Sequence, residues 1–433
     1  MKRQRNEKTI ESAAVAIYHS LLDCTIEQLQ ARKIQVTRQL QSSHASVSAT
    51  DKWASDEEDS DEEARKKKKK KKKKQKKGET DGTDNGGGSS NGTSATRSVE
   101  RYSKMSALGE GQFGTVFLAR DTITKNLCAL KQIKLTENIT GGEGFPTSAL
   151  REINVLQSLR HPNIIRVHDV VVGTTTDQIY IVMEYVSCEL GTLMVSMGES
   201  TFTMAEAKCL LSQLLDAVSY MHARLLVHRD IKPTNILYHS SSSSSSSSST
   251  GDNNHGRLVL CDFGLSCRIS KPKGGHLTPL VVTLYYRAVE ILLGDDQYDE
   301  SIDMWSVGCV FAELLTNKVL LPGKGEIDQL SKIFNVVGGP TIEEEKILCK
   351  HSNSKSMNWE EIRRNQSTLP KLIGQVPEGG EDCVDLLRGL LRYDATVRLT
   401  AEEAKKHHFL TSSPLPTEMA NMPKFIRSDA HKE

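Results

Sequence analysis

The stretch His228-Arg229-Asp230-Ile231-Lys232-Pro233-Thr234-Asn235 decides the fold of this chain. It is followed by Asp262-Phe263-Gly264, and it is preceded by Gly109-Glu110-Gly111-Gln112-Phe113-Gly114 and by Ala129-Leu130-Lys131. A short glycine pattern alone is a weak signal, because such patterns also arise in ordinary turns. Four motifs in this order rarely coincide, and together they bring glycines, a lysine and two aspartates to one site.

The glycine stretch predicts a loop that folds over phosphate groups. Gly109, Gly111 and Gly114 lack a Cβ, so their backbone can turn tightly and point amide groups at phosphate oxygens. Lys131 lies in an apolar segment, where an ammonium group needs an anionic partner. Phosphate oxygens and a carboxylate suit this need, and Glu152 on the following predicted helix is the candidate carboxylate.

The polar residues further along predict a site for magnesium ATP. Asn235 and Asp262 offer oxygen ligands for Mg²⁺. Asp230 is placed to orient and deprotonate an attacking hydroxyl, and Lys232 to neutralise a migrating phosphate. The expected catalytic residues are Asp230, Lys232, Lys131 and Glu152.

The composition fits a soluble intracellular protein with long polar additions. Of the 433 residues 37% are hydrophobic, and the net charge of +1 hides an acidic block, Ser55–Glu63, beside the lysine tract Lys66–Lys77. The nine cysteines show no Cys-x-x-Cys pair or zinc spacing. No stretch approaches the roughly 20 apolar residues that cross a bilayer, so we expect no membrane partner.

The lysine tract fits nuclear import, nucleic-acid contact or simple solvation, and we favour import. We therefore expect the nucleus as the location, with the cytoplasm as a further one. Beyond this tract, we expect no binding of nucleic acid.

Composition also divides the chain. Residues 1–41 predict a helical segment, a solvent-exposed helix being favoured over a coiled coil or docking helix, and residues 42–98 predict a disordered acidic and polylysine linker. Residues 99–410 read as the catalytic domain, with a sheet lobe over about 100–186 and a helical lobe over about 187–410. Residues 411–433 predict an extended tail.

A low-complexity insert covers residues 239–256 and includes ten consecutive serines, Ser240–Ser249. It separates two predicted hairpin strands, Ile236–Tyr238 and Leu258–Leu260. Because the entropy of loop closure grows slowly with length, we expect an insert at the hairpin tip that leaves Asp230 and Asp262 in place. Other predicted elements are strands at Thr115–Ala119, Cys128–Ile133 and Ile179–Tyr185, a helix at Ser148–Leu159, and a helix capped by Thr203 and Glu206.

Four stretches carry a family resemblance: Gly144–Ile153, Val281–Arg287, Asp303–Cys309 and Leu321–Leu330. With the first motifs they resemble the cyclin-dependent protein kinases, CMGC-type Ser/Thr kinases, and most of all the PITSLRE-type and related members linked to transcription or splicing. The resemblance covers about residues 100–410. It implies an α+β, bilobal protein kinase fold, with a small antiparallel sheet lobe that carries one regulatory helix and a larger, mainly helical lobe.

The resemblance implies a kinase that transfers phosphate to Ser/Thr, chiefly Ser/Thr-Pro sites, in cell-cycle or transcription and RNA-processing control. A cyclin would bind the Gly144–Leu156 region and press Glu152 towards Lys131, so we expect the isolated chain to be nearly inactive. An activating kinase would phosphorylate Thr278. The phosphate-coordinating residues would be Arg151 and Arg229, whereas the third arginine, Arg268, arrives one residue late.

The resemblance also implies a nucleotide site, with Met183 behind the adenine, Glu184–Val186 as the hinge between the lobes and Glu189 near the ribose. The full expected set is Leu108, Gly109, Glu110, Gly111, Gln112, Phe113, Gly114, Val116, Ala129, Lys131, Met183, Glu184, Val186, Glu189 and Leu237. Glu290, in Ala288-Val289-Glu290 where the family has Ala-Pro-Glu, is expected to form a structural ion pair with Arg398.

Two alternatives remain open. A mitogen-activated-type kinase shares the layout and the preference for proline, but the stretch between Gly264 and Thr283, which holds Thr278, lacks a Thr-x-Tyr pair. A pseudokinase scaffold would keep the fold without turnover, which the filled charge positions disfavour.

Overall fold

The computed structural model describes residues 98–111, 114–133, 147–173, 178–240, 254–269, 282–378 and 380–424. All described residues belong to one compact unit, Arg97–Glu433, which is the second unit referred to below. The predicted helical segment 1–41, and the predicted linker up to residue 97, lie outside the described residues.

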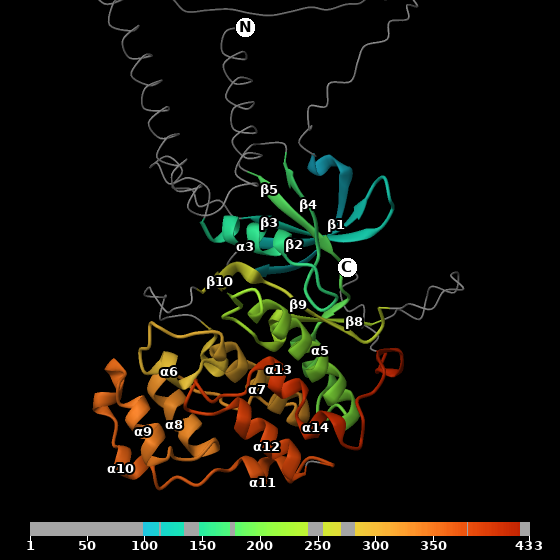
Figure 1. Cartoon of the computed structure of the whole chain (residues 1–433). Helices are drawn as coiled ribbons and strands as arrows, with labels where there is room; N and C mark the ends of the chain where they lie inside the picture. The colour runs from blue at the N-terminus through green and yellow to red at the C-terminus, as the bar shows by residue number, and fades with distance from the viewer. Residues whose placement is uncertain are drawn as a thin grey trace, which may run out of the picture. The chain divides into compact units, whose positions relative to one another are not determined.

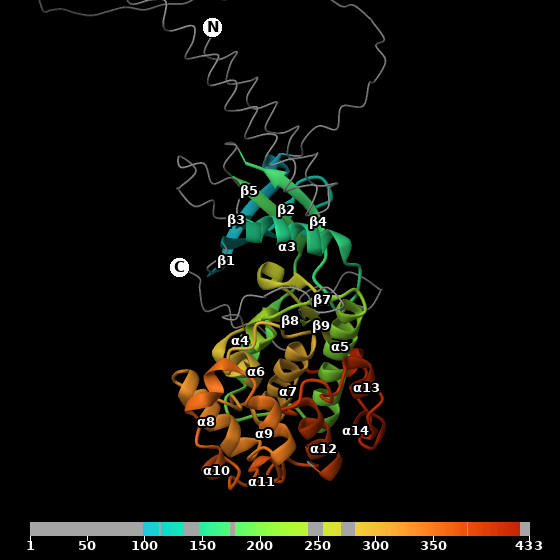
Figure 2. The same cartoon turned by 60° about the vertical axis from the view of Figure 1, so that its left-hand side comes forward.

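A five-stranded antiparallel sheet forms one part of the second unit (Figures 1 and 2). Its strand order is β1-β2-β3-β5-β4, and helix α3 (Thr147–Ser158) follows β3 in sequence. Small, β-branched and aromatic side chains of neighbouring strands, among them Ala119, Val171 and Tyr180, pack into a buried cluster. The strands are β1 (Tyr102–Gly111), β2 (Gly114–Asp121), β3 (Leu127–Ile133), β4 (Val167–Val172) and β5 (Ile179–Glu184).

The remainder of the unit is mainly helical (Figures 1 and 2). Helix α5 begins with the predicted capping box of Thr203 and Glu206, and α7 is buried around nearly its whole circumference, with Trp305 fully enclosed. The helices are α4 (Leu190–Met197), α5 (Met204–His222), α6 (Val289–Leu292), α7 (Ser301–Thr316), α8 (Glu326–Val336), α9 (Ile342–Leu348), α10 (Trp359–Ile362), α11 (Leu369–Ile373), α12 (Glu381–Leu390), α13 (Ala401–Lys405) and α14 (His408–Thr411).

Among the described residues, five short strands lie between β5 and α6 in the sequence, with α4 and α5 among them. β7 (Leu226–Val227) pairs with β10 (Cys267–Arg268), and β6 (Cys188–Glu189), β8 (Ile236–His239) and β9 (Arg257–Leu260) form a second small sheet. The β8–β9 hairpin is closed by a hydrogen bond from Gly256 N to His239 O, 2.9 Å long. Residues 241–253 of the polyserine insert lie outside the described residues.

The predicted tail is anchored rather than merely extended as far as residue 424. Buried Lys208 on α5 donates to the carbonyls of Ser412 and Pro414 at 3.0 and 2.8 Å. Further on, the Tyr238 hydroxyl donates to Pro423 O at 2.8 Å, and His255 Nε2 lies 2.7 Å from Met422 O. The strap 412–424 therefore joins α5 to the β8–β9 hairpin.

The predicted α+β, bilobal architecture is confirmed by this arrangement of one antiparallel sheet lobe and one helical lobe. Across the stretches that the structure describes, none of the helices is both long and apolar enough to span a bilayer.

Glu290 and Arg398 form a buried, two-pronged ion pair. The Arg398 Nη1 and Nη2 atoms lie 2.7 and 2.9 Å from the two carboxylate oxygens of Glu290, and both side chains are almost fully enclosed. Arg398 also donates to the carbonyls of Arg392 and Ser301. The pair therefore joins the start of α6 to the segment between α12 and α13.

We predict that Glu290→Gln destabilises the helical lobe, because it leaves the Arg398 charge buried without a counter-charge. Removing one partner of a buried pair costs roughly 3–5 kcal/mol. Urea denaturation should show a clearly lower midpoint. The matched control is Glu360→Gln, which removes an exposed partner of Arg364 and should cost less than about 0.5 kcal/mol. Equal midpoints for the two variants would contradict this role.

Candidate active site

The loop that carries Asp230 is fixed by a carboxylate beneath it. Asp303, on α7, is 1% exposed and accepts hydrogen bonds from the backbone N–H groups of His228 and Arg229 at 2.8 and 2.9 Å. The oxygen that accepts from His228 N, Oδ2, also lies 2.9 Å from His222 Nε2. Burial would raise the pKa of Asp303, but the bond and charge of His222 outweigh it and hold the pKa low. An ionised carboxylate therefore positions the loop.

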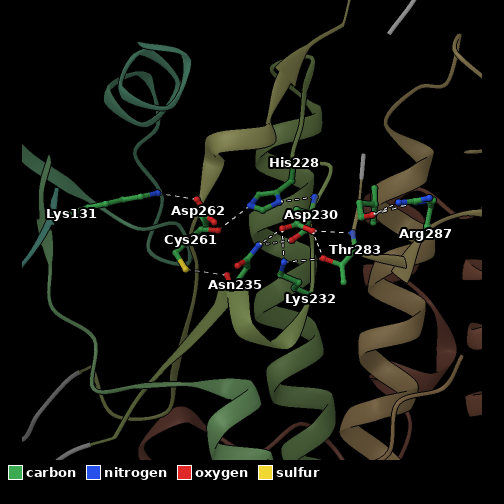
Figure 3. A network of polar contacts seen from close by, with 10 residues as sticks. Lys131, His228, Asp230, Lys232, Asn235, Cys261, Asp262, Thr283 and Arg287 are labelled. Carbon is green, nitrogen blue, oxygen red and sulfur yellow. Dashed lines mark hydrogen bonds and ion pairs between the residues drawn. The ribbon is translucent and has the colours of Figure 1, made fainter. Parts of the chain in front are cut away.

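This anchoring holds Arg229 in a strained backbone conformation. Arg229 has a φ of 68°, in the left-handed region that non-glycine residues seldom adopt. Its side chain is also held, since Nε donates to Leu265 O at 2.6 Å and Nη1 to the Tyr298 hydroxyl at 2.9 Å. The strained turn places the next residue, Asp230, at the centre of the network in Figure 3.

Asp230 is surrounded by donors. Lys232 Nζ lies 2.8 Å from one of its oxygens, and the Asn235 amide donates to that oxygen at 2.8 Å and to the Asp230 carbonyl at 2.9 Å. The backbone N–H and hydroxyl of Thr283 donate to the other oxygen at 3.1 and 2.8 Å. Burial would raise the pKa of Asp230, but the Lys232 contact and the Thr283 bond lower it overall.

Lys131, Glu152 and Asp262 form a second cluster. Lys131 Nζ lies 2.6 Å from Glu152 Oε1 and 3.0 Å from Asp262 Oδ1. Burial alone would lower the pKa of Lys131, but the two carboxylates raise it, so the lysine stays protonated. The structure thus shows Glu152 already paired with Lys131. This differs from the expectation that a partner must first press α3 inward to join them.

Asn235 and Asp262 are held close to each other by the residue between β9 and Asp262. Cys261 N donates to Asn235 O at 2.9 Å, and Asp262 follows with a strained φ of 61°. The side-chain amide nitrogen of Asn235 donates to Asp230. The side-chain oxygen of Asn235 is therefore left for another ligand. Within the described ranges, no group of three or more His, Cys, Asp and Glu could hold a metal. Two oxygen donors fit Mg²⁺, which takes its other ligands from phosphate and water.

The glycine stretch lies at the turn between β1 and β2, where Gly111 pairs with Gly114. Gly114 has a φ of 152°, and a Cβ there would clash with the carbonyl oxygen of Gln132 on β3. A Cβ at Gly109, by contrast, would meet nothing within 4 Å. The glycine at 114 is therefore required by the sheet itself, and the open space lies beside 109. Gln112 and Phe113 lie outside the described residues.

The expected adenine-binding residues come from strands of the five-stranded sheet and of the β6-β8-β9 sheet. Val116 is the cross-strand partner of Lys131, and Ala129 is that of Met183. Leu237 on β8 is paired with Glu189 on β6. The carboxylate of Glu184 accepts from Arg166 N and forms an ion pair with Arg257 of β9, so its side chain braces the hinge. Leu108 and Glu110 lie on β1, and Val186 is buried after β5.

The group of arginines expected to coordinate a phosphate on Thr278 is only partly described, because Thr278 itself lies outside the described residues. Arg151 is half-buried on α3, and Arg229 is held as given above. Arg268 lies in β10, and its Nη1 is 3.4 Å from Arg224 O. The backbone of Arg268 pairs with Leu226 of β7, while its side chain is exposed.

The turn before α6 holds a residue that the sequence did not single out. Val282 is a buried, β-branched residue with a φ of 68°. Its carbonyl oxygen accepts from Arg287 Nε at 3.3 Å and from Arg287 Nη2 at 3.1 Å. Figure 3 shows Arg287 on the far side of Thr283 from Asp230. The Val282 carbonyl, which Arg287 occupies, therefore belongs to the residue directly before Thr283, and Thr283 contacts Asp230.

Sequence reasoning assigned no role to Thr283, Asp303 or Arg287. Each occurred in a stretch used only for resemblance. Asp303 carried a usable signal, since it is a carboxylate that directly precedes the mainly apolar run Met304–Phe311. Thr283 and Arg287 carried none beyond their positions.

Comparison with known proteins now identifies the family. Residues 102–410 match the model of the protein kinase domain. The chain is 39% identical over 330 residues to cyclin-dependent kinase 11B of Rattus norvegicus, covering 76% of this chain and 70% of that protein. It is 38% identical over 329 residues to a probable cyclin-dependent kinase 10 of Dictyostelium discoideum, covering 76% and 84%.

The chain belongs to the protein kinase family. Within it, the predicted resemblance to cyclin-dependent kinases of the PITSLRE and related types is confirmed. A further relative, cyclin-dependent kinase G-2 of Oryza sativa subsp. indica, is 39% identical over 334 residues, which is 76% of this chain. The match spans 44% of that rice protein.

We predict that Thr283→Val moves the acid limb of the kcat profile to higher pH. The pKa of Asp230 is depressed, so its carboxylate persists as the pH falls and is lost only near that low pKa. Losing the Thr283 hydroxyl bond raises the pKa, and protonation then begins at higher pH. Turnover measured against pH checks this, with Thr283→Ser as the control that keeps the bond. Identical acid limbs in all three proteins would sink the claim.

Proposed function

We propose that this chain transfers the terminal phosphate of magnesium ATP to serine or threonine side chains of proteins. One observation carries this proposal: Asp230 is bonded to Asn235, and Asn235 is bonded through Cys261 to the segment that brings Asp262 to Lys131. A base, two metal ligands and a phosphate-binding lysine thus form one connected set. Family membership supports the same chemistry.

Each group would contribute by position and charge. Lys131, held by Glu152, would bind ATP phosphate oxygens. Asn235 and Asp262 would hold Mg²⁺, which supplies charge neutralisation between the phosphates. Asp230 would accept the proton of the attacking hydroxyl, and Lys232, which already touches Asp230 and Thr283, would balance negative charge on the transferred group.

Val282 supports a preference for proline after the phosphorylated residue. Its carbonyl lies one residue from Thr283 and already accepts from Arg287. A substrate backbone N–H placed there would find this acceptor occupied and would lose its bond to water, which is costly. Proline has no N–H to lose. The turn therefore favours Ser-Pro and Thr-Pro sites, as the resemblance implies.

A cyclin is the proposed partner, bound through the Gly144–Leu156 region. The names of the relatives, which are cyclin-dependent kinases, and the resemblance of this region support it. Because Glu152 is already joined to Lys131, such a partner would stabilise this position of α3 and order the segment around Thr278. The lysine tract supports a nuclear location, where control of the cell cycle, transcription or RNA processing would take place.

A pseudokinase is the second candidate, because the donors around Asp230 already occupy it in this state. Turnover is still favoured, because Lys131, Asp230 and Asp262, the charged residues that phosphate transfer requires, are all present. A mitogen-activated-type kinase would share the Val282 turn, but it lacks support from the named relatives.

We predict that Asp230→Asn lowers phosphate transfer by about 10²–10⁴-fold while ATP affinity stays nearly unchanged, because the carboxylate acts on the hydroxyl. Asp262→Asn is the contrasting variant, since it should weaken binding of magnesium ATP. Radiolabel transfer and titration calorimetry separate the two. Undiminished turnover in Asp230→Asn would refute the assigned role.

We predict that the tagged full chain, purified from its own cells, brings down a cyclin and phosphorylates Ser-Pro peptides. The control replaces half-buried Arg151 and the adjoining Gly144–Leu150 stretch by alanine, which should release the cyclin. Mass spectrometry of the bound fraction gives the result. Recovery of full activity from a fraction that contains no cyclin would exclude cyclin dependence.

A further inference from the structure

The turn at Val282 needs outside support. A left-handed φ at a β-branched residue is unfavourable by itself and persists only where neighbours hold it. Arg287 provides one such hold, because the Nε and Nη2 edge of its guanidinium faces the Val282 carbonyl. The orientation of one guanidinium therefore determines whether this carbonyl stays occupied.

The opposite edge of the same guanidinium is also held. Arg287 Nη1 lies 2.8 Å from Oε1 of Glu326, the first residue of α8. The Arg287 side chain is 12% exposed and that of Glu326 48%, so the pair lies at the protein surface. A guanidinium fixed along both edges cannot rotate away from Val282 without breaking an ion pair.

A second residue of α8 supports the same turn. Gln329 is fully buried, and its Nε2 lies 3.4 Å from Tyr285 O, while its Oε1 accepts from Gly323 N at 2.9 Å. The first turn of α8 therefore contacts the 282–287 segment at two points. The first turn of α8 thus supports the Val282 turn. Under the proposed function, the Val282 turn faces the substrate residue that follows the phosphorylated serine or threonine.

We propose that Glu326 is a positioning residue for proline selectivity, acting through Arg287 on the Val282 carbonyl. Glu326 need not touch the substrate. When it is lost, Arg287 rotates more freely, the carbonyl becomes available as an acceptor, and a residue with an N–H is rejected less strongly. This inference rests on the proposed kinase function.

The test compares two peptides that differ only in Pro or Ala after the phosphorylated serine. The full chain, purified from its own cells with its bound partner, is assayed as wild type and as Glu326→Gln. The matched control is Asp328→Asn, which removes the same charge from the same helical turn but contacts Lys324 N rather than Arg287. The measured quantity is the ratio of kcat/KM for the two peptides.

We expect Glu326→Gln to lower this Pro/Ala ratio by about two- to fivefold, the range that loss of an exposed ion pair gives. The change should come mainly from faster use of the Ala peptide, and Asp328→Asn should keep the wild-type ratio. Added salt should lower the wild-type ratio through screening of the pair but leave the Glu326→Gln ratio unchanged.

The outcomes separate the inference from the function beneath it. Turnover with an equal ratio in wild type and Glu326→Gln would overturn the positioning role alone, as would an equal loss in Asp328→Asn. A uniform fall for both peptides would show a merely structural role and also overturn it. Wild-type protein that phosphorylates neither peptide would overturn the proposed function and the inference with it.

Discussion

One buried carboxylate positions the candidate catalytic loop of this kinase domain. Asp303 lies on the largely buried helix α7 and accepts hydrogen bonds from two consecutive backbone N–H groups of the loop that carries Asp230. Those two bonds hold Arg229 in a left-handed conformation that it would not keep alone. Asp230 follows immediately, so its position depends on the helical core. Rigid packing of α7 is thereby transmitted to the group that would handle the substrate proton.

The connection between the lobes works in a similar way. Lys131 belongs to the sheet, Asp262 belongs to the segment after β9, and Glu152 belongs to α3, yet all three meet in one buried cluster. Desolvation of these charges is offset by their mutual attraction and short contacts. The cluster therefore couples α3 to the sheet and to Asp262, one of the two proposed metal ligands. Any partner that alters α3 would act on all three.

The sequence indicated most of the architecture because the motifs and periodicities were strong. The strands at β2, β3 and β5, the helix α3 and the capped start of α5 were all expected within a few residues. β4 was not, because His168-Asp169-Val170-Val171-Val172 resembles a loop followed by an apolar run. The packing of the strap 412–424 was also missed, since it depends on the buried Lys208 side chain and not on any local pattern.

The candidate site shows where such prediction ends. The charged residues proposed to contact phosphate, such as Lys131 and Lys232, lie in recognisable motifs and could be predicted from the sequence. Thr283, Arg287 and Asp303 act through hydrogen bonds to residues that are distant in sequence or to backbone atoms, and those contacts exist only after folding. The strain at Val282 could not be foreseen either, because valine ordinarily avoids that conformation.

The closed base of the β8–β9 hairpin has a consequence for how this chain tolerates change. Gly256 is bonded to His239, the last residue of β8, and the strap is bonded to Tyr238 of β8 and to His255, which precedes β9. These hydrogen bonds would take up the strain of a bulky insertion between residues 241 and 253 before the strain reached Asn235 or Asp262. The serine run is therefore a suitable place to insert a fluorescent reporter.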